Sequence, residues 1–171
     1  SPMSSILKVD TIQTTAGAAP TANGLGITPT SGSVIQLRKA ESSGIINLSA
    51  SSSYTNVLTH TITPSSTSSK IKVHVTMIYH TPHNNNINHL FRIKRNGATT
   101  SHGWQQDSGQ AQYLQYRSVG LLNDIPVPFI YTILDEPNTT SQITYTLDVK
   151  PTAGGLYLYN GRQIFLEEIA G

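Results

Sequence analysis

Apolar and polar residues alternate with a period of two over much of the chain from Val34 onward. The clearest run covers residues 71–80, in which the apolar positions are Ile71, Val73, Val75, Met77 and Tyr79. Such a period is typical of a β-strand that buries one face. A second strand-like run precedes it, and the two are separated by the Ser/Thr-rich connector Thr63–Lys70. The pattern predicts two long antiparallel neighbours within residues 54–80, joined by a solvated loop.

Strand-like runs separated by turn signals continue to the C-terminus. Asn96-Gly97 predicts a tight hairpin, because both residues accept a positive φ. Pro126 and Pro128 confine the start of the following strand to a sheet edge, since proline cannot donate to the ladder. Asn160-Gly161 predicts a closing hairpin whose second strand is central in its sheet.

These runs predict an all-β chain built as an antiparallel β-sandwich of the jelly-roll type. No stretch of the folded part has a helical period. Residues 1–33 differ, because one short apolar patch is followed by a tract of small residues, Gly and Pro that cannot bury enough surface to fold alone. We therefore expect an extended N-terminal arm over residues 1–33 and a β-sandwich head domain over residues 34–171. The arm is either a flexible linker or a segment that becomes ordered against a partner.

Charge is sparse in this chain. Charged residues make up 12% of it, against roughly 25% in an average soluble domain, and Ser, Thr, Asn and Gln take their place. The formal net charge of +2 gives no electrostatic footprint for nucleic acid, and no apolar window is long enough for a membrane span. There is no cysteine, so disulfides and thiolate chemistry are excluded and oligomerisation is the expected source of extra stability. The N-terminus also lacks the basic-then-apolar pattern of a signal peptide.

The histidines and acids offer little chemistry. His74 and His80 are expected on one strand face but roughly 20 Å apart, which is too far to share an ion. Asp135-Glu136 and Glu167-Glu168 fall in a turn and near the chain end, where solvated acids are usual. No P-loop, nucleophile elbow or dinucleotide fingerprint occurs. We therefore expect no metal, no cofactor and no catalytic residue.

Recognition of a polar ligand is the more credible chemistry. Sugar-binding surfaces combine amides, which pair with hydroxyls, with an aromatic face for the apolar side of the ring. Two expected loops carry this combination, and the candidate receptor-binding residues are His83, Asn84, Asn85, Asn86, Trp104, Gln105, Gln106 and Tyr113. Trp104 is the only tryptophan, and a place in the core or in an interface explains it equally well.

Several segments resemble phage structural proteins. The sequences LKVDTI at residues 7–12, ITPSSTSSKI at residues 62–71 and IFLEEI at residues 164–169 are similar to tail-fibre or virion proteins of phages, especially those of cyanobacteria and other aquatic bacteria. The resemblance covers nearly the whole chain and is weaker over residues 81–124. It implies a homotrimeric fibre whose heads are similar to the jelly rolls of the tumour necrosis factor and complement-collagen families. It also implies that the arm attaches the head to other virion proteins, and the candidate attachment residues are Ile6, Leu7, Val9 and Ile12.

Three functions compete at this point. The first is a fibre or fibre tip that adheres to the host surface through a glycan or a protein. The second is a purely structural virion component, such as a capsid-bound fibre, a decoration protein or an adaptor. The third, an enzyme such as a depolymerase, is far behind. In each case the expected location is the virion, assembled in the host cytoplasm, with no nucleic-acid partner and no membrane insertion.

Overall fold

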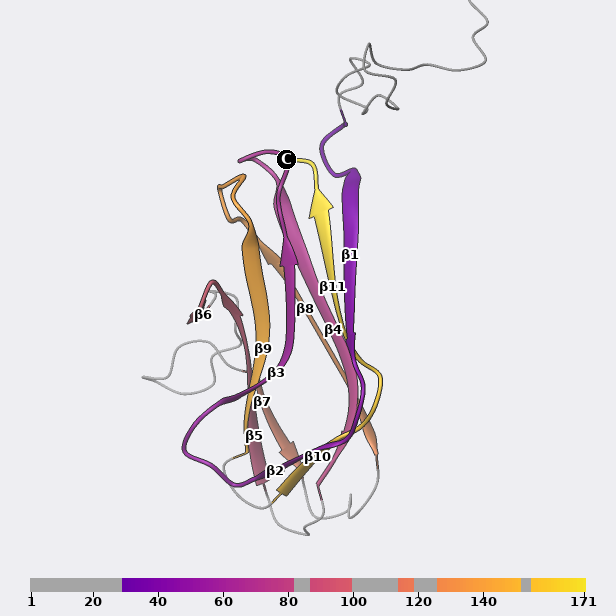
Figure 1. Ribbon diagram of the computed structural model, residues 1–171, viewed down its shortest axis with the longest axis vertical. Coiled ribbons are helices and arrows are strands. Elements are labelled where there is room, and N and C mark those ends of the chain that lie inside the picture. Colours follow the sequence, from indigo (N-terminus) through magenta and orange to yellow (C-terminus); the bar gives the residue numbers. More distant parts are fainter. Residues whose placement is uncertain (1–28, 82–86, 100–113, 119–125, 152–154) are drawn as a thin grey trace, which may run out of the picture.

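Figure 1 shows the computed structural model, which describes residues 29–81, 87–99, 114–118, 126–151 and 155–171. Every helix or strand in these ranges is a β-strand, so the all-β prediction is confirmed. The described residues contain no helix that is long and apolar enough to cross a membrane. The strands are β1 (Val34–Ser42), β2 (Ile46–Ser49), β3 (Thr55–Ile62), β4 (Lys70–His80), β5 (Ile87–Arg95), β6 (Ala98–Thr99), β7 (Leu114–Ser118), β8 (Val127–Asp135), β9 (Ile143–Pro151), β10 (Gly155–Leu158) and β11 (Arg162–Ile169).

The strands form two antiparallel sheets. In sheet A, β4 pairs with β8 on one side and with β11 and β10 on the other, while β1 pairs with β11 and β2 with β10. In sheet B, β9 lies between β3 and β5, and β6 and β7 pair with the other side of β5. If β1/β2, β6/β7 and β10/β11 are each counted as one interrupted strand, the described strands can be renumbered 1 to 8 in chain order. The strand orders are then 1-8-3-6 in sheet A and 2-7-4-5 in sheet B. This interleaving of two Greek keys is the jelly roll that the sequence predicts.

The predicted closing hairpin is wrong. β10 and β11 do not pair with each other, because both pair with the same side of β4: Leu158 lies opposite Tyr79, and Gln163 lies opposite Thr76. They are one strand interrupted at Tyr159–Gly161, where Gly161 has a φ of 78°. Asn-Gly supports a positive φ in a bulge as readily as in a hairpin turn.

The predicted pairing within residues 54–80 is also wrong. β3 pairs with β9 in sheet B, whereas β4 is in sheet A, so the connector Thr63–Ser69 crosses from one sheet to the other. Nor is this connector fully solvated, because Ser69 is buried. A period of two specifies which face of a strand is buried but not which strand is its neighbour.

Glu168 anchors the connector from β11. Its Oε1 accepts hydrogen bonds from the Ser65 backbone N–H, the Ser65 hydroxyl and the Ser69 hydroxyl, each at 2.7 Å, and its Oε2 accepts one from Gln36. Burial alone would raise the pKa of this carboxyl, but the hydrogen bonds from Ser65, Ser69 and Gln36 together lower it. Glu168 is therefore a buried structural acid and not the solvated acid that its place near the chain end predicts.

Asp135 is a second buried acid at the same end of the sandwich. Its carboxylate accepts two hydrogen bonds from Nη1 of Arg95, at 2.9 and 3.1 Å, and one from the Tyr145 hydroxyl at 2.6 Å. This acid, too, differs from the solvated turn residue that the sequence predicts. The contacts link β8 of sheet A to β5 and β9 of sheet B across the edge of the core.

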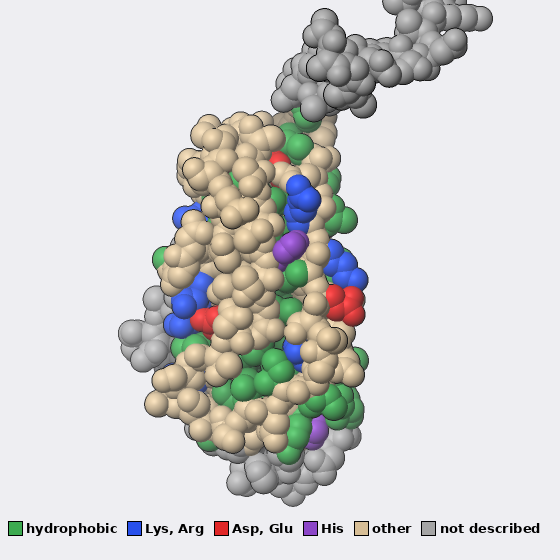
Figure 2. Space-filling model, viewed as in Figure 1, with side chains coloured by type: hydrophobic (Ala, Val, Ile, Leu, Met, Phe, Trp, Pro, Cys, Tyr) green, Lys and Arg blue, Asp and Glu red, His purple; other side chains and the backbone are tan. Residues whose placement is uncertain are grey.

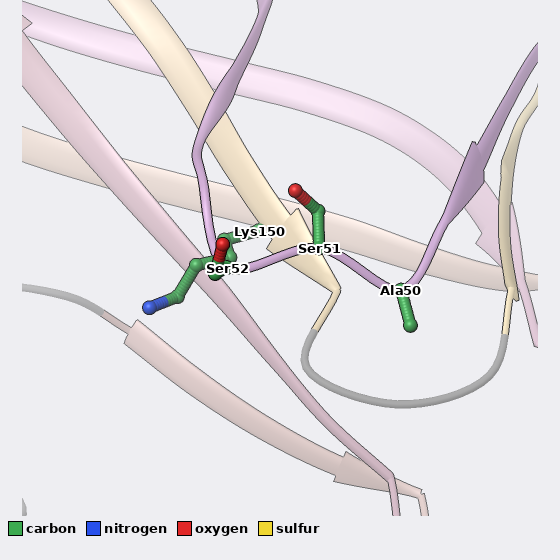
Figure 3. Close-up of a pocket in the computed structure, with 4 residues that line it drawn as sticks. All are labelled: Ala50, Ser51, Ser52 and Lys150. Carbon is green, nitrogen blue, oxygen red and sulfur yellow. The ribbon is translucent and has the colours of Figure 1, made fainter.

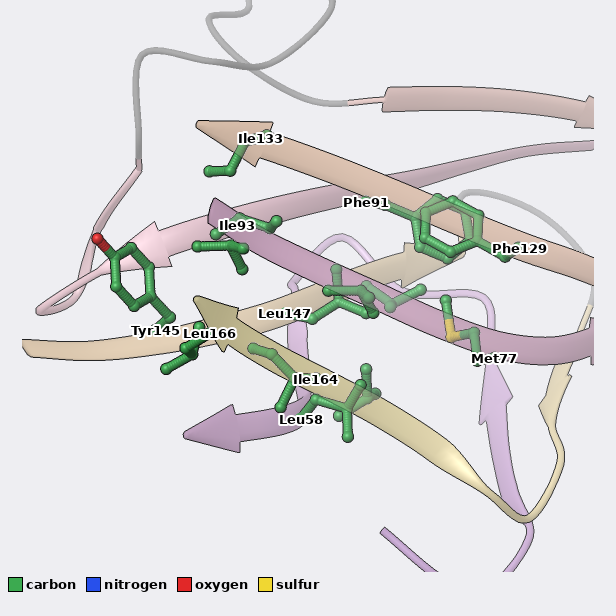
Figure 4. Packing of buried hydrophobic residues seen from close by; sticks show 14 of the residues in the cluster. Leu58, Met77, Phe91, Ile93, Phe129, Ile133, Tyr145, Leu147, Ile164 and Leu166 are labelled. Atoms are coloured by element: carbon green, nitrogen blue, oxygen red, sulfur yellow. The ribbon is translucent and has the colours of Figure 1, made fainter. Parts of the chain in front are cut away.

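The core lies between the sheets. All five apolar residues of the alternating run in β4 are buried, and they meet Phe91 from β5 and Phe129 from β8. The rings of Phe91 and Phe129 stack with a centroid separation of 4.4 Å (Figure 4). Burial of this many large side chains, at about 1.5–3 kcal/mol each, is the main favourable term in the folding of the head.

Arg162 holds together two adjacent interruptions of sheet A. The interruption between β1 and β2 contains Gly44, with a φ of 86°, and lies beside the one between β10 and β11, since Ser42 pairs with Arg162. The Arg162 side chain is buried, and its Nη1 donates to the carbonyls of Gly44, Tyr159 and Leu158 at 2.7, 2.7 and 3.3 Å. Its Nη2 donates to the Ser42 hydroxyl at 2.9 Å. Strand interruptions leave carbonyls outside the ladder, and the guanidinium supplies their donors.

We predict that Arg162→Met lowers the free energy of unfolding by about 3 kcal/mol, because it leaves buried carbonyls without donors. Urea denaturation monitored by circular dichroism measures this change. The control is Arg38→Met, which removes an exposed guanidinium from β1 and should cost at most about 0.5 kcal/mol. Equal losses in the two variants would contradict the role given to Arg162.

Candidate functional site

The sandwich has two distinct ends (Figure 1). The arm end holds the start of β1 and the C-terminal residue Gly171, and here the backbone of Gly32 donates to Ala170 while that of Ala170 donates to Ser33, each at 2.8 Å. The opposite end, which we call the loop end, holds the end of β4 at His80, the start of β5 at Ile87 and the end of β9 at Pro151. The chain therefore enters the head beside the C-terminus and far from the loop end.

The residues predicted to bind a receptor lie outside the described residues. His83, Asn84, Asn85 and Asn86 fall between β4 and β5, whose flanking strand ends are at the loop end. The remaining receptor-binding candidates, Trp104, Gln105, Gln106 and Tyr113, fall between β6 and β7. Those two strands pair with the outer edge of β5, so the two candidate groups are attached to the head at different places. The attachment candidates Ile6, Leu7, Val9 and Ile12 also lie outside the described residues.

The described residues form a depression at the loop end. It has a volume of about 430 Å³ and is lined by Ala50, Ser51, Ser52 and Lys150. Figure 3 shows the two Ser hydroxyls and the Lys150 amine pointing in different directions. The Lys150 amine lies 5.1 Å from the centroid of the Tyr54 ring, over which the Arg92 guanidinium also lies at 3.7 Å. Because its polar groups do not converge, we assign no ligand to this depression.

An aromatic group lies on sheet A near the loop end. The ring of His80 stacks on that of Tyr157 with a centroid separation of 4.6 Å and an interplanar angle of 9°. The Tyr159 hydroxyl and His80 Nδ1 are 3.0 Å apart and share a hydrogen bond. These side chains interlock β4 with the interrupted strand β10/β11. No cluster of three or more potential metal ligands occurs among the described residues.

His89 is buried beneath the loop end. It packs edge-on against Tyr79, with ring centroids 6.4 Å apart, and neither ring nitrogen has a hydrogen-bond partner among the described residues. Burial lowers the pKa of His89 from 6.5 to about 4, because a charged imidazolium would lose its solvation there. His89 is therefore neutral at pH 7, and its protonation opposes folding.

The outer faces of the two sheets differ in chemistry. On sheet A, cross-strand partners form rows from β8 through β4 and β11 to β1. The rows are Leu134–Lys72–Glu167–Leu37, Thr132–His74–Phe165–Lys39 and Ile130–Thr76–Gln163–Glu41. Lys72 and Glu167 form an ion pair of 3.0 Å, and the His74 Nδ1 shares a hydrogen bond of 2.7 Å with the Thr132 hydroxyl. This face thus mixes paired charges with exposed apolar side chains.

The outer face of sheet B is polar. Asp148 on β9 pairs with both Arg92 and Lys94 on β5, each at 3.2 Å, and the neighbouring positions of β3 and β9 carry Thr59 and Thr146. Figure 2 looks onto one side of the molecule, where charged side chains are few and most of the surface is neither charged nor hydrophobic. The sparse charge expected from composition is thus visible at this surface.

Comparisons with known proteins identify no family. No family model and no curated protein sequence match the chain. Solved structures of infectious bursal disease virus are similar in part: its Gx strain at a TM-score of 0.48 and 9% identity, and its VP2 subviral particle at 0.43 and 11%. These matches cover 81% of this chain and 33% and 34% of the respective viral chains. The chain therefore spans about a third of the length of the chains it matches, and the jelly-roll assignment rests on the strand order given above.

Arg162 and His89 are structural residues that the sequence analysis did not single out, and it placed Asp135 and Glu168 in solvent although both are buried. Each is a polar residue whose burial depends on a pairing between distant strands. The available signal for His89 was its place on the apolar face of the run Ile87–Arg95, two residues before the buried Phe91. No sequence signal pointed to the burial of Arg162, because Asn160-Gly161 indicated an exposed turn beside it.

We predict that the head loses stability in mild acid through His89. The pKa of His89 is about 4 in the folded state, below the unfolded value of 6.5. The stability that depends on a neutral His89 is therefore complete above pH 6.5 and is lost as the pH falls toward 4. The shift corresponds to about 3 kcal/mol. Between pH 6.5 and 4, the free energy of unfolding should fall by about 3 kcal/mol less in His89→Leu than in the unaltered chain. Urea denaturation at several pH values measures both falls. An unchanged pH profile in His89→Leu would contradict this account.

Proposed function

We propose that this chain is a virion fibre protein of a phage, and that its β head adheres to the host surface. The head acts as a homotrimer, its N-terminal arm attaches it to other virion proteins, and its receptor is a surface glycan or protein, with a glycan favoured. The protein is not an enzyme in this proposal and needs no cofactor. Its place is the virion.

The separation of the two ends of the head carries this proposal. The chain enters at the arm end, beside the C-terminus, and the segment with His83 and Asn84–Asn86 is attached to strand ends at the loop end. A head anchored through its arm would present that segment away from the particle. Surface loops on a rigid β scaffold are a common place for binding residues.

The sequence adds further support. The KVDTI and TPSSTSSK segments resemble phage fibre and virion proteins, and the resemblance weakens over residues 81–124, as expected if the loops there vary with the receptor. The jelly-roll strand order is the fold that this resemblance implies. The cysteine-free composition and sparse charge suit a virion protein that is stabilised by assembly.

The second candidate function is a structural virion component without a receptor. The strands that flank the predicted receptor-binding residues favour it, because β4 and β5 flank one group at the loop end and β6 and β7 flank the other at the edge of sheet B. A single receptor site would need both groups to meet. The depression at the loop end does not supply converging polar groups either.

We predict that the purified full chain binds host cells, and that replacing Asn84, Asn85 and Asn86 together by alanine, or Trp104 by alanine, abolishes binding. A pull-down of labelled protein with intact cells measures it. The control variants are Thr67→Ala and Ser141→Ala, which change exposed hydroxyl residues in the β3–β4 and β8–β9 connections and should bind as the unaltered chain does.

Binding to capsids with no binding to host cells would favour the structural candidate. Turnover of host polysaccharide would instead overturn the non-enzymatic assignment. Immunogold labelling of the particle then locates the protein on the tail or the capsid.

A further inference from the structure

We infer that the outer face of sheet A is the surface through which copies of this chain associate, an inference that rests on the oligomeric head proposed above. The large apolar side chains that are exposed in the described residues are unevenly distributed. All of them lie in strands of sheet A or in the link between β1 and β2, and their exposed fractions run from 42% to 65%. They are Val34, Leu37, Ile45, Ile78, Ile130 and Leu134. Sheet B contributes none within the described residues.

The exposed apolar residues are concentrated along β8 and its neighbour β4. Pro128, Ile130 and Leu134 are on the outer face of β8, and Ile78 on β4 lies opposite Pro128. β8 pairs only with β4 among the described strands, so this apolar strip is at the edge of sheet A. An apolar edge strand is an unfavourable surface for an isolated molecule and a favourable one for association.

The sequence of these strands supports burial on both faces. Met77-Ile78-Tyr79 interrupts the alternation of β4, and β8 has an unbroken apolar run from Val127 to Tyr131 followed by the apolar pair Ile133-Leu134. Continuous apolar runs are typical of strands covered on both sides. The core covers one side of β4 and β8, and nothing within the described residues covers the other.

A second copy of the chain suits the charge and size of this face. Its charged residues include two lysines and two glutamates, paired as Lys72–Glu167 and Lys39–Glu41, so these residues give the face no net charge that would repel another copy. Four strands spaced about 4.8 Å apart, each of about nine residues at roughly 3.3 Å, give a face of roughly 600 Å² in projection. Because side chains project from the sheet, the accessible area exceeds this projected area and comes close to the roughly 800 Å² per partner of a stable interface.

The N-terminal arm is a poorer occupant. Its apolar patch, residues 6–12, would extend over roughly 23 Å as a single strand. Such a segment can cover one row of side chains along a strand, whereas the exposed apolar positions reach from Leu37 on β1 to Leu134 on β8, across the whole width of the sheet.

The test compares two charge insertions in the full chain by light scattering after gel filtration at micromolar concentration. Ile130→Glu places a carboxylate in the apolar strip, and Thr61→Glu places one on the outer face of sheet B. We expect the unaltered chain and Thr61→Glu to have the mass of a trimer, and Ile130→Glu to have the mass of a monomer, with association weakened by about tenfold or more. Far-ultraviolet circular dichroism shows that each variant is folded.

If Ile130→Glu does not fold, Ile130→Thr keeps a β-branched side chain and should still weaken association. The inference is overturned if the unaltered chain is a monomer, or if Ile130→Glu or Ile130→Thr associates as strongly as Thr61→Glu. The mass measurement involves no receptor, so its failure is distinct from that of the proposed adhesion. A trimer that ignores host cells overturns adhesion alone, and a monomer that binds them overturns the homotrimer and the interface but not adhesion.

Discussion

The shape of sheet A depends on a single guanidinium, that of Arg162, which donates hydrogen bonds to backbone carbonyls at two strand interruptions. A jelly roll must curve its sheets around the core, and strand interruptions with positive-φ glycines provide this curvature at the cost of broken ladders. Gly44 and Gly161 provide it here, at adjacent positions of neighbouring strands. The carbonyls released at both sites converge on Arg162, whose planar fork donates to several acceptors at once. Without that donor the same interruptions would leave buried acceptors unpaired, which is costlier than a regular ladder.

Buried polar residues are handled differently at the two ends of the head. At the arm end, Asp135 and Glu168 are each satisfied by several donors, and both join segments that are distant in the sequence. At the loop end, the buried His89 has no such donors among the described residues and remains neutral. Asp135 and Glu168 at the arm end are therefore held by hydrogen bonds, whereas the His89 ring at the loop end is held by apolar packing.

Much of the fold was predictable from the sequence, because alternation reports directly on burial. The extent of β4, the Asn96-Gly97 turn with both residues at positive φ, the edge position of β8 and the central position of β11 all follow from local rules and agree with the structure. The pairings were not predictable in the same way. Ser- and Thr-rich residues suit both a hairpin loop and a crossing between sheets, and Thr63–Ser69 proved to be a crossing whose hydroxyls bind Glu168. The predicted receptor-binding residues remain predictions, because they lie outside the described part of the chain.

The departures from alternation carry as much information as the alternation itself. In β4 and β8 the outward positions should be polar if water covers them, and at Ile78, Ile130 and Leu134 they are not. On β9 of sheet B the corresponding positions are polar: Thr144 and Thr146 are partly exposed, and Asp148 is buried in ion pairs with Arg92 and Lys94. Both sheets enclose the same core, so the folding of one molecule cannot account for the difference. Association of copies through the outside of sheet A, as proposed above, would account for it.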